Sequence, residues 1–164
     1  MPIGVVLPKS DDDVEAAIKI AKEEGIPVLP RGSGTSQNGQ AIGEALLIDT
    51  TRHLNQIIDF DRENQTACVQ PGLVLDHLNR YLKPHGLFYP VDVSTANRAT
   101  LGGMTGNNSC GARSIRYGNM VHNVLSVEAL LANGSKAHFK KLNGDATNGN
   151  VSDELLQKLL SLGE

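Results

Sequence analysis

Apolar and polar positions in the first part of the chain predict a strand, a helix and a second strand. Residues 4–7 form a short apolar run, and a second one follows at residues 26–29. Between them, Ser10 and Asp13 provide the capping box of a helix, and Gly25 is placed to end it. The apolar residues of this helix have the i, i+3, i+4 and i+7 spacing of one face: they are Val14, Ala17, Ile18 and Ala21.

The middle of the chain reads as further strands joined by tight turns. An apolar strand is expected at residues 45–48, and a hairpin at residues 56–60 and 66–70 around a polar turn. Asn133 and Gly134 lie between two extended runs, which predicts a second tight hairpin.

Two more helices complete the pattern. Leu75, Leu78 and Leu82 share a face, and Pro84 stops the helix that carries them. Leucines at residues 152–162 fit a last helix. Strands and helices together indicate a mixed α+β fold.

Two glycine-rich segments interrupt this pattern. The first glycine segment, residues 30–39, reads PRGSGTSQNG, and the second glycine segment, residues 100–118, reads TLGGMTGNNSCGARSIRYG. Glycine permits positive φ and brings main-chain N–H groups close to a ligand, and successive bare N–H groups bind anions. We therefore expect both segments to be loops on two sides of one phosphate-bearing cofactor site. Ordinary surface turns are the alternative, because glycine clusters usually mark turns.

The side chains of the first glycine segment suit a pyrophosphate. Arg31 is its one permanent cation, and short polar side chains surround Gly32 and Gly34; they are Ser33, Thr35, Ser36 and Gln37. Known nucleotide motifs do not fit. Gln37 occupies the third glycine position of G-x-G-x-x-G, which excludes a Rossmann turn, and there is no G-x-x-x-x-G-K-[ST] sequence.

Composition narrows the function classes. Net charge is −3, and Lys and Arg are scattered, so nucleic-acid binding gains little support. No apolar run approaches the roughly 18 residues of a membrane span, and the N-terminus has no signal-peptide pattern; a cytoplasmic protein is expected. No His, Cys, Asp and Glu cluster suggests a metal site or an activated nucleophile. Any chemistry would then come from a cofactor.

Several single residues have a plain structural interpretation beside a functional one. Cys110 is expected to be a small packed residue rather than a flavin attachment point, and Cys68 and Cys110 to be free thiols. Asp92 is expected to cap a loop, and His77 and His85 to cap or pack.

Four stretches resemble a known family. They read VVLPKSDDDVEAAIKIAKEEGIPVLPRGSGTS, VQPGLVLDHLNRYLKPHGL, DVSTANRATLGGMTGNNSCGARSIRYGNMVHNV and LLANG. They are similar to the PCMH-type FAD-binding domain of the FAD-linked oxidases of the vanillyl-alcohol oxidase type. That family includes D-lactate, glycolate and D-2-hydroxyglutarate dehydrogenases, and the wording is nearest to large bacterial members that carry C-terminal iron-sulfur domains.

The resemblance implies FAD held between two small α/β subdomains, with hydride passing from a 2-hydroxy acid to the flavin. The subdomains would be residues 1–50, with the pyrophosphate loop, and residues 51–140, with the flavin loop; residues 141–164 would be a loop and a partial helix. Relatives that attach FAD covalently use a histidine where Thr35 and Ser36 stand here, so non-covalent FAD is implied. The implied cofactor-binding residues are Pro30, Arg31, Gly32, Ser33, Gly34, Thr35, Ser36, Gln37, Thr100, Gly102, Gly103, Asn108, Ser109, Gly111, Gly118 and Val124.

The resemblance also implies that this chain is a fragment, incomplete at its C-terminal side. The parent would be an FAD-dependent 2-hydroxy-acid dehydrogenase or oxidase, with iron-sulfur clusters allowed in its missing part, and the isolated piece would be inactive. No catalytic residue is assigned, and the substrate and the electron acceptor stay open. The alternative function is a non-catalytic module that binds a nucleotide or another phosphorylated ligand.

Overall fold

The structure is a computed structural model that describes residues 1–141, 158 and 161–162. Contacts divide the chain into two units, Met1–Asn123 and Val124–Glu164, and each is described by itself. The helix expected at residues 152–162 lies almost entirely outside the described residues. The subdomain boundary expected at residue 50 stays a prediction.

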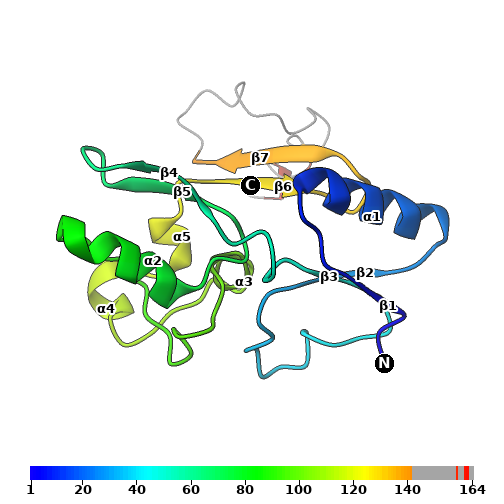
Figure 1. The fold of residues 1–164 in the computed structure, drawn as a ribbon, viewed down its shortest axis with the longest axis horizontal. Coiled ribbons are helices and arrows are strands. Elements are labelled where there is room, and N and C mark those ends of the chain that lie inside the picture. The colour runs from blue at the N-terminus through cyan, green and yellow to red at the C-terminus, as the bar shows by residue number, and fades with distance from the viewer. Residues whose placement is uncertain (142–157, 159–160, 163–164) are drawn as a thin grey trace. The chain divides into compact units, whose positions relative to one another are not determined.

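The first unit contains a parallel sheet of three strands (Figure 1). These are β1 (Gly4–Val6), β2 (Val28–Arg31) and β3 (Leu46–Asp49), in the order β1-β3-β2. The central strand β3 is the most buried of the three, with Leu47 and Ile48 in the core. Such burial is typical of parallel sheets, which are covered on their faces.

Helix α1 (Asp11–Glu23) connects β1 to β2 and follows the expected pattern. The Ser10 hydroxyl accepts the N–H of Asp13 at 3.3 Å, and the Asp13 carboxylate accepts the N–H of Ser10 at 3.2 Å. Gly25 has a φ of +64°, which ends the helix in the left-handed region. The face carrying Ala17, Ile18 and Ala21 is buried, so the predicted helix, its cap and its apolar face are confirmed.

Strand β2 lies two residues later than predicted and includes Pro30 and Arg31, which the sequence analysis placed in a loop. Pro30 pairs with Ile48 of β3. Proline is tolerated because β2 is an edge strand, where a missing N–H breaks no ladder. The connection from β2 to β3, residues 32–45, contains no helix, so residues 32–39 of the first glycine segment lie on the crossover between two parallel strands.

A hairpin and a helix follow as predicted. Strands β4 (Ile57–Asp61) and β5 (Thr66–Val69) are antiparallel. Helix α2 (Leu75–Leu82) continues into the 3₁₀ turn η1 (Lys83–His85), after which Gly86 is left-handed.

The second glycine segment is not the continuous loop that was expected. It forms α3 (Leu101–Gly106) and α4 (Ser114–Tyr117), and α5 (Met120–Asn123) follows closely. Leu101 and Met104 are buried one helical turn apart. Their burial stabilises a turn of helix that the glycines by themselves disfavour.

The second unit contains the predicted second hairpin. Strands β6 (Ser126–Leu130) and β7 (Lys136–Lys140) are antiparallel. Gly134 has a φ of +86°, and Asn133 accepts the N–H of Ser135 at 2.9 Å. Across the described residues, no helix combines the length and the apolar character that crossing a membrane requires.

Candidate functional site

The first glycine segment presents a row of main-chain donors. Within the described residues, none of the N–H groups of residues 32–38 donates a hydrogen bond to the protein. Gly34 has a φ of +69°, which lets the segment turn sharply. The Ser33 hydroxyl is buried and has no hydrogen-bond partner. Buried polar atoms in folded proteins are nearly always paired, so an orphaned one marks a place for a ligand or water.

Arg31 holds this segment in shape. Its Nη1 donates to the carbonyl of Ala41 at 2.8 Å. Its guanidinium packs across Gly34, where any side chain would begin within 2.5 Å of Nη2. One donor of the five on the guanidinium is thus used to fix the loop, and the remaining donors stay close to Gly34.

The two glycine segments touch each other. Gly32 packs directly against the Thr100 hydroxyl, so that a side chain at residue 32 would overlap it. Thr100 is 3% exposed and precedes the first turn of α3. Gly103 lies beside the same hydroxyl, 3.1 Å from where its own side chain would begin. The expectation that both segments border one place in the fold is therefore met at these three residues.

The turn at Pro71 and Gly72 also lies beside the contact between the two glycine segments, and it was not predicted to do so. The N–H of Gly102 donates to the carbonyl of Pro71 at 2.8 Å. Gly72 packs against the carbonyls of Thr50 and Leu54. The N–H of Thr50 donates to the main-chain carbonyl of Arg31 at 3.2 Å. The carboxyl ends of β2 and β3 thus meet the start of α3. The Pro-Gly pair after β5 was the sequence signal that could have indicated this turn.

The N–H groups of the second glycine segment are mostly used inside the protein. Five of its residues donate main-chain hydrogen bonds of 2.8–3.0 Å to protein acceptors: Gly102, Asn108, Ser109, Gly111 and Gly118. The expected row of bare N–H groups is wrong for these five, because a helical turn and its caps need them. Gly103 differs, since it is exposed and its N–H has no acceptor among the described residues.

Other polar residues of this segment support neighbouring elements. Asn108 has a φ of +44° and accepts the N–H of Val121 at the start of α5, at 3.0 Å. Gly111 packs against Asp92, whose carboxylate accepts the N–H of Arg113 at 3.0 Å. The interpretation of Asp92 as a loop cap is confirmed.

The remaining candidates fall into three groups. Cys68 and Cys110 are free and exposed, so the packed interpretation of Cys110 is wrong. The His85 ring lies 4.9 Å from that of Phe60 and packs as expected. Val124 begins the second unit, and its assignment rests on the resemblance alone.

A glycine-rich crossover with unpaired N–H groups packs against the buried Thr100 before α3, and comparison with known proteins identifies the family of the chain. The chain belongs to the FAD-binding domain family, which matches residues 2–140. The expected α+β FAD-binding fold and its cofactor are confirmed.

Particular relatives are two bacterial proteins and one solved structure. The D-2-hydroxyglutarate dehydrogenase of Escherichia coli (strain K12) is 42% identical over 82% of this chain. The glycolate oxidase subunit GlcD of Bacillus subtilis (strain 168) is 39% identical, also over 82%. The structure of alkyldihydroxyacetonephosphate synthase superposes with a TM-score of 0.74 and 26% identity over 86% of this chain and 28% of that one. The chain spans 14% of the first relative and 29% of the second.

Proposed function

We propose that residues 32–38 bind the diphosphate of FAD, within the FAD-binding part of an enzyme that oxidises a small 2-hydroxy acid. The observation that carries this proposal is the row of bare N–H groups beside the orphaned Ser33 hydroxyl. A diphosphate presents several acceptor oxygens and negative charge, which such donors satisfy. Arg31 adds a guanidinium at Gly34 on the same segment, so the donor set fits the group.

The other proposed contacts divide by what their atoms can offer. Gly103 and Thr100 lie against the first glycine segment, and the exposed N–H of Gly103 is a further donor. Contacts by the remaining residues are proposed from the resemblance. Among those with occupied N–H groups, Asn108 and Ser109 would act through their side chains, while Gly102, Gly111 and Gly118 would act through the backbone path that their packing against Pro71, Asp92 and His122 allows. Non-covalent attachment follows from Thr35 and Ser36, which have no nucleophilic ring nitrogen.

The substrate class is proposed from the relatives. Two of them are named for oxidising D-2-hydroxyglutarate and glycolate, which are both small 2-hydroxy acids. FAD supplies the two-electron acceptor when it is bound. The part played by this chain's own residues is to hold the cofactor's diphosphate. We also propose that the parent acts in the cytoplasm.

The test uses Ser33→Ala in an FAD titration followed by flavin fluorescence. A hydrogen bond to a charged group contributes about 1.5–3 kcal/mol, so the Kd for FAD should rise about tenfold or more. The same change removes a buried hydroxyl without a partner. The free energy of unfolding without FAD should therefore stay the same or rise by about 1 kcal/mol. Weaker binding with unchanged or greater stability is a result that a purely structural serine would not give.

Thr66→Val is the matched control, because it removes a hydroxyl from β5, away from both glycine segments. It should leave the Kd for FAD unchanged. Equal FAD affinity in Ser33→Ala and in the unchanged chain would refute the assignment of residues 32–38. ADP that binds far more tightly than FAD would instead favour a nucleotide-binding module, the function left open by the residues alone.

A further inference from the structure

A depression of about 640 Å³ that is open to solvent, called the cavity below, lies in the first unit, and no residue of the first glycine segment lines it. It is formed by the end of α2, the segment that follows η1, and α4. The residues that line it are Asn79, Lys83, Leu87, Phe88, Ala112, Arg113, Ile115, Arg116 and Tyr117. Its volume is in the range of small-molecule sites, about 300–1,000 Å³.

The polar groups of this cavity are nearly all donors. Lys83, Arg113 and Arg116 line it, and no Asp or Glu does. Among the residues that the structure describes, none of these three cations makes an ion pair. The Oδ1 of Asn79 already accepts the N–H of Tyr89 at 2.7 Å, which leaves its amide N–H₂ to face a ligand. A ligand must therefore bring its own acceptors, and a negative charge suits them best.

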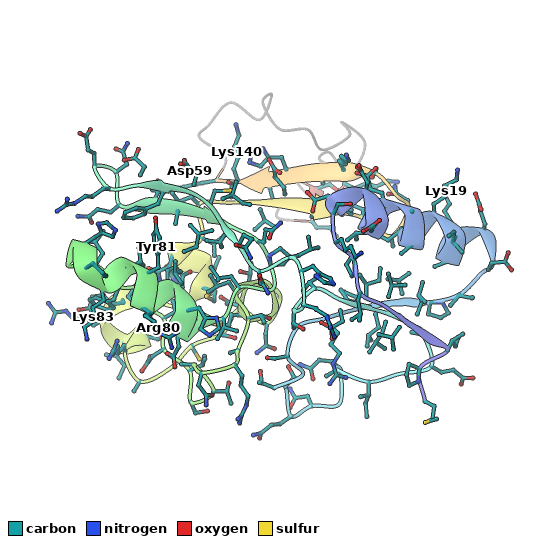
Figure 2. All side chains as sticks on the ribbon, in the orientation of Figure 1. Lys19, Asp59, Arg80, Tyr81, Lys83 and Lys140 are labelled. Carbon is teal, nitrogen blue, oxygen red and sulfur yellow. The ribbon has the colours of Figure 1, made fainter. Side chains whose placement is uncertain are left out.

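The local charge is positive although the chain as a whole is acidic. Arg80 lies in the last turn of α2, three residues before Lys83 at the start of η1, and Figure 2 labels both side chains. Two acidic residues lie nearby in the chain: Asp92 accepts the main-chain N–H of Arg113, and Asp76 precedes Arg80 by one turn of α2. The lining itself holds three cations and no carboxylate, which leaves a net positive surface that attracts anions.

The aromatic part of the lining consists of two partly exposed rings. The rings of Phe88 and Tyr117 meet edge to face with centroids 5.8 Å apart. The Arg113 guanidinium carbon lies 5.6 Å from the centre of the Phe88 ring, and that of Arg116 lies 5.4 Å from the Tyr117 ring. Phe88 is 48% exposed and Tyr117 is 37% exposed. Planar cations held beside aromatic rings provide stacking surfaces and charge together.

We propose that this cavity binds a small anion that carries a flat apolar ring, such as an aromatic carboxylate or an aryl phosphate. The ligand's ring would lie against the exposed face of one of the two perpendicular rings, Phe88 or Tyr117, and meet the edge of the other, and the anionic group would accept hydrogen bonds from Arg113 and Arg116. A ligand with only a negative charge would leave the aromatic rings without a partner, and a ligand with only an apolar ring would leave the cations without one. The site shares no residue with residues 32–38, and its residues 112–117 lie between Gly111 and Gly118, which are proposed above as further FAD contacts.

The test is a titration of the isotope-labelled chain with four probes, followed by ¹H–¹⁵N NMR. Phenyl phosphate and benzoate carry both a ring and an anion, inorganic phosphate carries the anion alone, and benzyl alcohol carries the ring alone. The two combined probes should saturate and shift the amide signals of residues 112–117 and the side-chain amide of Asn79. Their Kd should be at least fivefold lower than that of either single-feature probe.

Variants locate the binding. Arg113→Gln with Arg116→Gln should raise the Kd for phenyl phosphate at least tenfold, and both residues are exposed, so the fold should persist. Arg52→Gln with Arg62→Gln removes the same charge from exposed positions outside the cavity and should change nothing. Unchanged binding in the first variant, equal affinities for phosphate and phenyl phosphate, or shifts confined to residues 32–38 would each overturn the proposal.

Discussion

At the scale of single residues, glycine serves two different purposes within the second glycine segment. The space that a side chain would need at Gly102 is filled by Pro71, and at Gly111 it is filled by Asp92. No atom lies within 4 Å of the corresponding position at Gly106. Glycine at the first two positions is thus required by the protein's own packing, whatever ligand binds nearby.

This difference predicts opposite effects for two substitutions in the same short helix. Gly102→Val should lower the free energy of unfolding by about 3 kcal/mol, because main-chain atoms of Pro71 cannot move aside. Gly106→Ala should raise it by about 0.5 kcal/mol, because alanine favours the helix. Urea denaturation of both variants measures the two effects. Loss of FAD binding in Gly102→Val would say nothing about contact with FAD, and a stable Gly102→Val chain would contradict the packing.

Tyr89 provides a residue-scale prediction for alkaline pH. Burial raises the pKa of its phenol to about 12 from an ordinary value of 10.0, and the hydroxyl donates to the Met120 sulfur at 3.4 Å. The folded chain holds this proton more tightly than the unfolded chain. The resulting stability is complete below pH 10.0 and is lost as the pH rises toward about 12.

The measurement is a titration of tyrosinate absorbance on the folded chain, which has three tyrosines. A late step near pH 12 is expected, and Tyr89→Phe should remove that step. If the step persists in Tyr89→Phe, it belongs to another residue.

At the scale of elements, local signals determine α1. The capping box of Ser10 and Asp13 joins two otherwise unpaired main-chain N–H groups to side chains. Ser10→Ala should therefore lower the free energy of unfolding by about 1 kcal/mol, as read from thermal or urea unfolding. Ser10→Asp, which keeps an acceptor at the cap, should lower it much less. An equal decrease in the free energy of unfolding in both variants would show that loss of the cap hydrogen bond is not the cause of the decrease.

The same comparison explains which elements the sequence could predict. Helix α1 and the hairpin turn at Asn133 and Gly134 carry their signals within a few residues, and both were predicted. Helix α3 was missed because its glycines favour a loop, while the contacts that stabilise it come from Pro71 and from the pairing of Leu73 with Leu101. Those partners lie about thirty residues away in the sequence, beyond the reach of local patterns.

Some features of the candidate site could likewise be predicted from local sequence, and others could not. The donor-rich character of residues 32–38 follows from their own composition and was predicted. The use of Arg31 as a loop clamp on Ala41, and the loss of free N–H groups in the second glycine segment, depend on tertiary hydrogen bonds. Glycine content alone cannot distinguish a residue that makes room for a ligand from one that makes room for the chain.

At the scale of the whole molecule, FAD should act as a stabilising ligand. A ligand that binds only the folded chain at 100 times its Kd raises the free energy of unfolding by about 2.7 kcal/mol. Urea unfolding with and without FAD measures this rise. Riboflavin, which lacks the diphosphate, should stabilise the chain much less if residues 32–38 provide the main contacts. Equal stabilisation by both would place the main contacts on the isoalloxazine ring instead.

Gly32 and Thr100 are in contact although they are 68 residues apart in the sequence, so a substitution at one limits which residues fit at the other. An engineer who transplants the crossover of residues 32–45 into a related scaffold must check the residue that stands at position 100 there. A larger side chain at that position would push the loop away from the sheet. A smaller one would open room for alanine at position 32. Residues 32 and 100 should therefore be transferred together, although they are far apart in the sequence.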